Sequence, residues 1–127
     1  MKPLVYKKAR RQRTTKVTRH RMHITKGDHV RVVRGEDAGK EGTVLRVFPK
    51  VNRVVVEGVN TVKRHRKATR ADEEGGVITF AAPIHASNVM LLDPKSKAPT
   101  RVRRKQNADG SVERLSTKSG QPIPRKR

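Results

Sequence analysis

Residues 27–47 read GDHVRVVRGEDAGKEGTVLRV and predict a strand, a glycine-rich turn and a second strand. Val30 and Val32 alternate with polar neighbours, which is the two-residue period of a strand with one buried face. The run from Gly35 to Gly42 combines three glycines with acidic residues and a lysine, a composition that suits an exposed turn. From Thr43 the chain is β-branched and apolar again, so a second strand follows the turn.

Further short strands follow. Residues 49–52 connect two apolar runs and predict a hairpin tip that leads into a third strand at 53–58. Later apolar runs predict strands at 77–81 and 89–92. Short strands on tight turns are typical of small curled sheets and barrels, so we expect a mostly β fold.

The C-terminal third is basic. Segments 101–104 and 112–115 flank Asp109 and Gly110 and predict a final basic hairpin. From Ser116 onward serine, lysine, glycine and proline dominate and predict a flexible tail.

The composition limits the size of the core. A chain of 127 residues favours one domain. Val, Ile, Leu and Phe make up about 22% of it, only just above the level at which a highly charged chain stays disordered. We therefore expect a small core that leaves parts of the chain outside it.

The net charge of +21, from 32 basic and 11 acidic side chains, indicates a polyanionic partner, because self-repulsion on this scale opposes compaction. Nucleic acid fits best, since positive charge runs the length of the chain. An anionic membrane is the alternative, but no stretch pairs a basic face with a broad apolar one, and no run of 18 apolar residues exists. Cysteine is absent, which excludes disulfides and thiolate metal sites.

Residues 1–26 contain ten lysines and arginines and no acid, and their apolar residues follow no period. This predicts a basic tail that is disordered in the isolated protein. With RNA present we expect it to order along phosphates, most strongly at Arg10, Arg11 and Arg13. A cleaved transit peptide is an alternative, although serine is missing and no apolar helical face forms.

The turn from Gly35 to Gly42 has two interpretations. Its glycines can serve only the positive φ of a tight turn. Alternatively, the missing side chains let backbone N–H groups approach RNA phosphates, with Lys40 adding a charge. The spacing matches no nucleotide-binding loop, and no helix follows.

The densest basic cluster is Lys63 to Lys67, together with Arg70. No acid lies within it, and it directly follows a predicted strand, which places it at the edge of the folded part. A solvated charge run is the alternative to a phosphate-binding site. Tyr6, Phe48 and Phe80 are the only aromatic residues, so the chain lacks platforms for stacking bases and should recognise RNA shape and backbone.

No cofactor, metal or catalytic site is expected. His20, His23 and His29 lie near one another in sequence, but no cysteine or ordered carboxylate set completes a metal site. The acidic run at 72–74 lies in a loop without the convergent partners of a catalytic pair.

The ordered motifs of the chain resemble a known family. The alternating valines after residue 28, the 39–42 turn and the valines that follow it are similar to the KOW motif. The match continues, in order, through Val56-Glu57-Gly58-Val59-Asn60, Val62-Lys63-Arg64-His65, Pro83-Ile84-His85 and Ser87-Asn88-Val89-Met90-Leu91. From about Ile24 to Arg103 this set resembles the bacterial large-subunit ribosomal protein twenty-four family. A KOW module of a NusG-type transcription factor is the alternative, but such a factor carries a separate α/β domain before the KOW segment, and the 26-residue basic segment found there cannot supply one.

The resemblance implies a small SH3-like (KOW) barrel with a further β-hairpin region and extended basic N- and C-terminal tails. It divides the chain into a basic extension (1–23), the KOW-type β domain (24–97) and a basic hairpin with a tail (98–127). The family's usual start falls close to Met22, so the resemblance gives residues 1–21 no role.

The resemblance also implies a function. The protein would be a non-enzymatic constituent of the large subunit of the cytoplasmic ribosome. It would bind the 5′ region of the large-subunit RNA early in assembly, beside other ribosomal proteins. A hairpin at Pro49, Lys50, Val51, Asn52 and Arg53 would lie at the exit of the polypeptide tunnel, near the nascent chain.

Charge, glycine content and the resemblance together define the expected RNA contacts. They are Lys26, Gly35, Gly39, Lys40, Gly42, Lys63, Arg64, His65, Arg66, Lys67, Arg70, Arg101, Arg103 and Arg104, with Arg10, Arg11 and Arg13 in the N-terminal segment.

Overall fold

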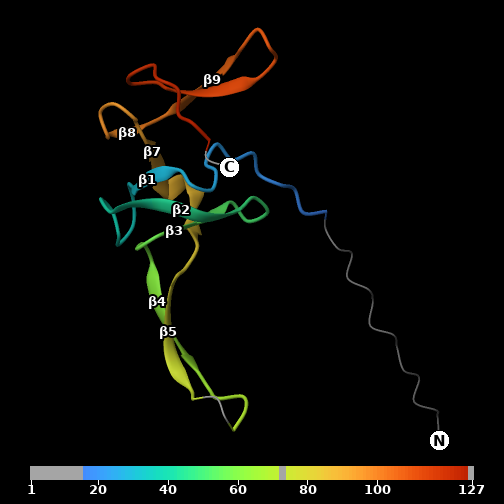
Figure 1. Ribbon diagram of the computed structural model, residues 1–127, viewed down its shortest axis with the longest axis vertical. Helices are drawn as coiled ribbons and strands as arrows, with labels where there is room; N and C mark the ends of the chain where they lie inside the picture. The colour runs from blue at the N-terminus through green and yellow to red at the C-terminus, as the bar shows by residue number, and fades with distance from the viewer. Residues whose placement is uncertain (1–15, 72–73, 126–127) are drawn as a thin grey trace, which may run out of the picture.

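The computed structural model describes residues 16–71 and 74–125 and is built almost entirely of β-strands (Figure 1). A single 3-10 turn, η1 (Ala86–Asn88), interrupts them. The strands are β1 (His29–Val32), β2 (Glu41–Phe48), β3 (Arg53–Val56), β4 (Thr61–Arg66), β5 (Gly76–Ala81), β6 (Ile84–His85), β7 (Val89–Leu92), β8 (Pro99–Thr100), β9 (Val102–Gln106) and β10 (Val112–Ser116). The expectation of a mostly β chain is confirmed.

A six-stranded sheet in the order β6-β3-β2-β1-β7-β8 forms the centre of the molecule. The predicted strand, turn and strand are β1 and β2, which pair antiparallel with Val30 opposite Gly42. β2 continues through the tight turn at 49–52 into β3. The local sequence pattern is therefore realised as two successive hairpins that share β2.

A bulge in β2 curls this sheet. The pairing with β3 shifts register between Val44 and Arg46, and the intervening Leu45 is exposed. A bulge bends its strand and increases the local twist, so β2 pairs with β1 near its start and with β3 along the rest. The result is a small curled β domain, extended by two further hairpins.

The core of the curled sheet is rich in valine. Inward positions alternate along β1, β3 and β7, as the two-residue period requires. The buried apolar side chains are Ile24, Val30, Val32, Val44, Val54, Val56, Val59, Val89, Leu91 and Ile123. Each buried side chain of this size contributes about 1.5–3 kcal/mol relative to leaving it exposed.

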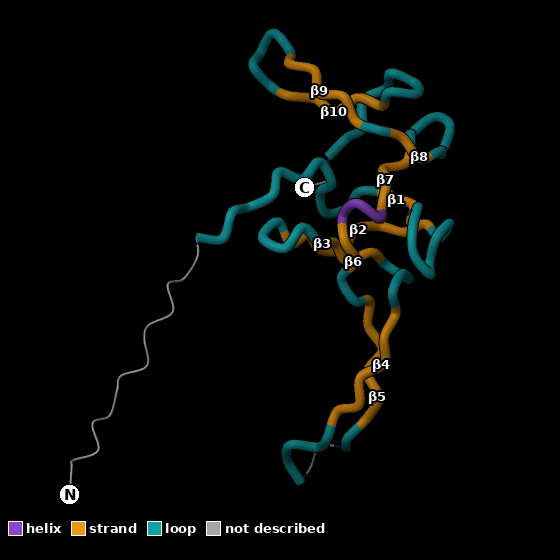
Figure 2. The backbone as a smooth tube through the Cα atoms, turned by 180° about the vertical axis from the view of Figure 1, so that it is seen from behind, coloured by secondary structure: helices purple, strands orange, loops and turns teal. Residues whose placement is uncertain are grey.

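Two hairpins leave the sheet at opposite ends of the molecule (Figures 1 and 2). β4 and β5 form a long two-stranded ribbon, called the projecting hairpin below, and β9 pairs with β10 at the other end. The expectation that the basic cluster follows a strand was wrong, because Lys63 to Arg66 lie within β4. The β-branched and aromatic residues of β5 provide the pairing partner that makes this charged segment a strand.

The C-terminal segment differs from the flexible tail that its composition predicts. The Ile123 N–H donates to the Arg114 carbonyl at 2.7 Å, and Pro122 bridges to Leu115, so residues 116–123 fold back. This fold-back places the Ile123 side chain in the apolar core. At the other terminus Ile24 is also buried and Met22 packs against the core, although no periodicity predicted a core role for either.

Candidate nucleic-acid interface

The projecting hairpin is a basic surface. All six side chains of β4 are exposed, and neither β4 nor β5 contains an acid. Lys67 and Arg70 follow in the exposed loop. The structure thus presents Lys63, Arg64, His65 and Arg66 on one extended ribbon, where these side chains can reach phosphates.

The glycine-rich turn is held in place by Asp37. Its carboxylate accepts the Asn60 backbone N–H at 2.6 Å and the Lys40 ammonium at 2.5 Å. These hydrogen bonds, the one from Lys40 foremost, lower the pKa of Asp37. Lys40 remains exposed at the surface of the turn, but its charge is already paired.

The three glycines of the turn occupy different structural environments. Gly39 has a φ of 92°, and its N–H donates to the Val32 carbonyl at 2.7 Å, so that donor is already used within the fold. Gly42 lies under β3, where a Cβ would stand 2.4 Å from the Glu57 carbonyl oxygen. Gly35 is exposed, with a φ of 108° and open space around it. Gly39 is also exposed and has open space at its Cβ position, so Gly35 and Gly39, but not Gly42, leave room for an approaching backbone.

The tip between β2 and β3 is exposed at Val51 and flanked by Lys50 and Arg53. Asn52 adopts a φ of 54°, which allows the tight turn, and its carbonyl accepts the Ala86 N–H at 3.0 Å. The Pro49 carbonyl accepts the His20 N–H at 2.9 Å, so the basic N-terminal segment passes beside this tip.

The C-terminal hairpin presents Arg101, Arg103 and Arg104 to solvent. Sequence reasoning grouped Arg114 with this basic surface, but the structure buries it against Asp28. No local pattern distinguishes Arg114 from its exposed neighbours, and its partner lies 86 residues away. Burial, followed by the positive charges of Arg114 and Arg104, lowers the pKa of nearby His23 and so favours the neutral form of this histidine.

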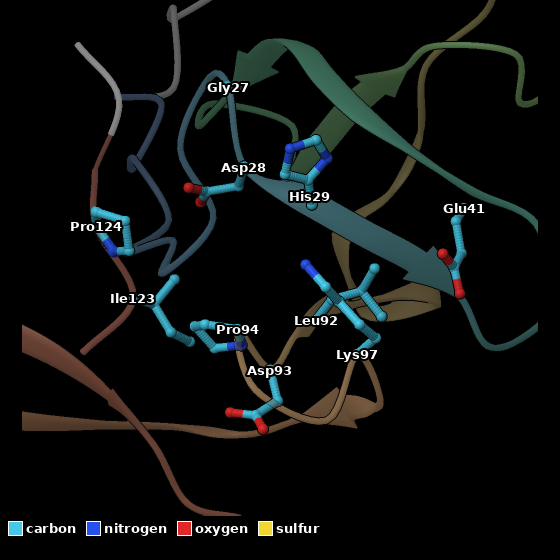
Figure 3. A pocket seen from close by; sticks show the side chains of 10 residues that line it. All are labelled: Gly27, Asp28, His29, Glu41, Leu92, Asp93, Pro94, Lys97, Ile123 and Pro124. Atoms are coloured by element: carbon cyan, nitrogen blue, oxygen red, sulfur yellow. The ribbon is translucent and has the colours of Figure 1, made fainter. Parts of the chain in front are cut away.

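Two buried acidic side chains, Asp28 and Asp93, stabilise the fold. A cavity of about 420 Å³ lies between the start of β1, the turn after β7 and the folded-back C-terminus, with Asp28 and Asp93 among its lining residues (Figure 3). Asp28 is bound by Arg114, and Asp93 accepts hydrogen bonds from Ser96 and Ser119. The Ser119 hydroxyl foremost lowers the pKa of Asp93. Both carboxylates are therefore held by partners within the fold and stabilise it.

Residues 16–71 and 74–125 contain no group of three or more His, Asp or Glu side chains that could hold a metal ion. The described part of the chain also forms no helix long and apolar enough to cross a membrane.

The expected contacts do not form one patch. Lys26 is exposed in the turn before β1, beside the sheet, whereas the two basic hairpins point to opposite ends of the molecule (Figure 1). Arg10, Arg11 and Arg13 lie outside the described residues. Any polyanion that contacts all of the described positions must therefore follow an extended path along the molecule.

Comparisons with known proteins agree with these features. Residues 26–57 match the KOW motif, and residues 59–123 match the family described as large ribosomal subunit protein uL24, C-terminal domain. Proteins named large ribosomal subunit protein uL24 from Bacillus thuringiensis (strain Al Hakam), Bacillus cereus (strain B4264) and Bacillus anthracis (strain CDC 684 / NRRL 3495) are each 55% identical over 100 residues. The similarity covers 79% of this chain and 96% of each relative.

Proposed function

The chain belongs to the uL24 family of large ribosomal subunit proteins, and on that basis we propose that it binds large-subunit ribosomal RNA through its two basic hairpins and its glycine-rich turn. Membership makes it a structural, non-enzymatic constituent of the large subunit in the cytoplasmic ribosome. Its partners are accordingly ribosomal RNA and other ribosomal proteins.

The proposal rests mainly on the exposed basic surface of the projecting hairpin. The hairpin presents four consecutive basic or imidazole side chains, all exposed, on a strand pair without acids. Such a surface is costly to maintain in isolation, because the like charges repel one another. RNA phosphates neutralise the charges and release counterions, which favours binding.

The mode of binding follows from the side chains available. Lysine and arginine contact phosphates and fix the position of a protein on RNA, while the folded sheet fixes its orientation. Phe48 is only half-exposed and lies under the Arg46 guanidinium, 4.8 Å from the ring centroid, so it is not presented for stacking. Recognition of RNA shape and backbone therefore dominates in this proposal.

The finer parts of the proposal come from the family resemblance. They are binding to the 5′ region of the large-subunit RNA, action early in assembly, and a position near the tunnel exit for the tip at Pro49 to Arg53. The projecting hairpin reaches further from the sheet than that tip (Figure 2), so it is the second candidate for an approach to the nascent chain. Crosslinking nascent chains to a probe at Val51 or at Ala71 would distinguish the two.

The division of the chain at 23/24 and 97/98 also remains a proposal. The burial of Ile123 and Arg114 ties residues 98–125 to the sheet, which favours treating 24–123 as one folding unit.

Recovery of bound RNA from a cell lysate tests the proposed function. The tagged full chain should enrich large-subunit ribosomal RNA, with reads concentrated toward its 5′ region. A transcription-associated KOW module would instead enrich nascent messenger RNA, and a uniform RNA profile would contradict specific binding altogether.

A further inference from the structure

The two faces of the projecting hairpin differ in chemistry. Directly opposed residues of an antiparallel pair share a face, and successive residues alternate between faces. The pairs Val62 with Phe80 and Arg64 with Ile78 therefore lie on one face, called the Arg64 face. Lys63 with Thr79 and His65 with Val77 form the opposite face, called the Lys63 face.

The Arg64 face carries an uncovered apolar surface. The exposed fractions of Val62, Ile78 and Phe80 are 36%, 45% and 43%, although all three lie in regular strands. The Lys63 face of the hairpin also exposes an apolar side chain, Val77 at 55%, but it is isolated among Lys63, His65 and Thr79 and forms no continuous apolar strip. A two-stranded ribbon without a covering layer is only marginally stable in water. Its base is anchored by a hydrogen bond from the Ala82 N–H to the Asn60 carbonyl at 2.9 Å, so the ribbon starts from a fixed root. The rest of this face needs a partner.

The charge on the hairpin identifies the partner. Arg64 lies beside Ile78 on the same face, and a hollow of about 400 Å³ is lined by both of them together with His65, Arg66 and Lys67. A protein partner would have to supply carboxylates and an apolar patch in register with these side chains. RNA supplies regularly spaced phosphates next to ribose faces, and the minor groove of an RNA helix is wide and shallow enough to admit a flat ribbon.

We propose that the Arg64 face of the projecting hairpin lies in the minor groove of a ribosomal RNA helix. Ile78 and Phe80 contact ribose faces, and the Arg64 guanidinium binds a flanking phosphate with paired N–H donors. The inference rests on the proposed RNA-binding function and deepens it, because it assigns apolar residues and one defined face to the RNA contact. Lys63, on the other face, contributes only long-range attraction.

Adjacent residues provide matched controls. Arg64→Ala and Lys63→Ala each remove one basic side chain from the same strand, but from opposite faces. Ile78→Thr and Val77→Thr each remove apolar surface and keep a β-branched residue, so the hairpin pairing is retained. Circular dichroism and the urea midpoint of each variant confirm that the fold is unchanged.

Affinity for a large-subunit ribosomal RNA transcript is the first measurement. Arg64→Ala should weaken binding about five- to tenfold and lower the slope of log Kd against log salt by about one, while Lys63→Ala changes affinity about twofold or less. Ile78→Thr should weaken binding about threefold, and Val77→Thr should leave it unchanged. Equal effects within each pair would overturn the one-faced contact while leaving RNA binding intact. Absence of binding by the unsubstituted chain would contradict the proposed function itself.

Crosslinking in assembled large subunits identifies the molecule that contacts the Arg64 face. The chain has no cysteine, so Ile78→Cys and Val77→Cys each create a single site for a photoreactive thiol reagent. The probe at position 78 should give ribosomal RNA adducts at paired nucleotides, and the probe at position 77 should not. Adducts of position 78 with a ribosomal protein or a nascent chain, or no adduct at all, would overturn the proposal.

Discussion

Arg114 and Asp28 form a buried, bidentate ion pair, although they lie 86 residues apart in the chain. The guanidinium donates to both carboxylate oxygens, at 2.7 and 2.9 Å, and the two side chains are 1% and 2% exposed. Arg114 also donates to the carbonyls of His23 and Pro124. One side chain of the C-terminal hairpin thus joins the N-terminal segment, the start of β1 and the folded-back C-terminus.

Arg114→Met should lower the free energy of unfolding by about 3–5 kcal/mol, because it leaves the Asp28 carboxylate buried without its cation. Arg103→Met is the matched control, since Arg103 is exposed on the paired strand of the same hairpin and should change stability by about 0.5 kcal/mol or less. Urea denaturation measures both. Equal midpoints for the two variants would show that the ion pair does not hold the termini.

Gly42→Ala should destabilise the fold by about 1–3 kcal/mol, because the new methyl group would press against the Glu57 carbonyl and the Val56 side chain. Gly76→Ala, also in a strand, has open space at the Cβ position and should be nearly neutral. Thermal unfolding of the pair distinguishes a packing requirement at Gly42 from a general loss of glycine flexibility. A destabilised Gly76→Ala with an unaffected Gly42→Ala would contradict the assignment.

Asp93 should make stability depend on acid pH. Hydrogen bonds, chiefly from Ser119, hold its pKa below the ordinary value of 3.8, so the unfolded chain binds the proton first. The stabilisation by Asp93 is therefore complete above pH 3.8 and is lost as the pH falls through the folded pKa. Urea titrations of the unsubstituted chain and of Asp93→Asn should give a stability difference that is largest at neutral pH and shrinks in acid. A pH-independent difference would exclude this role.

The sequence predicts the centre of the fold well and its edges poorly. Val30 and Val32 reveal β1 because a half-buried strand must alternate. β4 carries no such alternation, since all its side chains are exposed, and only its pairing with β5 makes it a strand. Ile123 is a single aliphatic residue between two prolines, without the alternation that marks a strand, so its burial depends on a space that the rest of the fold creates.

The candidate interface shows the same limit. The density of positive charge in residues 63–67 is visible in the sequence, but the two-faced ribbon on which these residues lie is not. Arg114 looks like its exposed neighbours in sequence, yet it is buried, because its environment is set by the distant Asp28. Gly39 and Gly42 look alike in the sequence of the turn, yet the structure needs them for different reasons. The Gly39 N–H donates a hydrogen bond to the Val32 carbonyl, whereas Gly42 has no room for a side chain because the Glu57 carbonyl lies close by.

The salt dependence of affinity for large-subunit ribosomal RNA tests the central claim most directly. The claim is that exposed lysine and arginine side chains bind the RNA backbone, with the projecting hairpin as a principal site. The dissociation constant of the full chain should rise about a thousandfold or more between roughly 50 and 200 mM salt, as expected for six or more phosphate contacts. Simultaneous replacement of Lys63, Arg64, Arg66 and Lys67 by alanine should leave the domain folded, weaken binding and reduce the salt slope. A dissociation constant that stays flat across this salt range, or a folded variant with unchanged affinity and slope, would contradict the account.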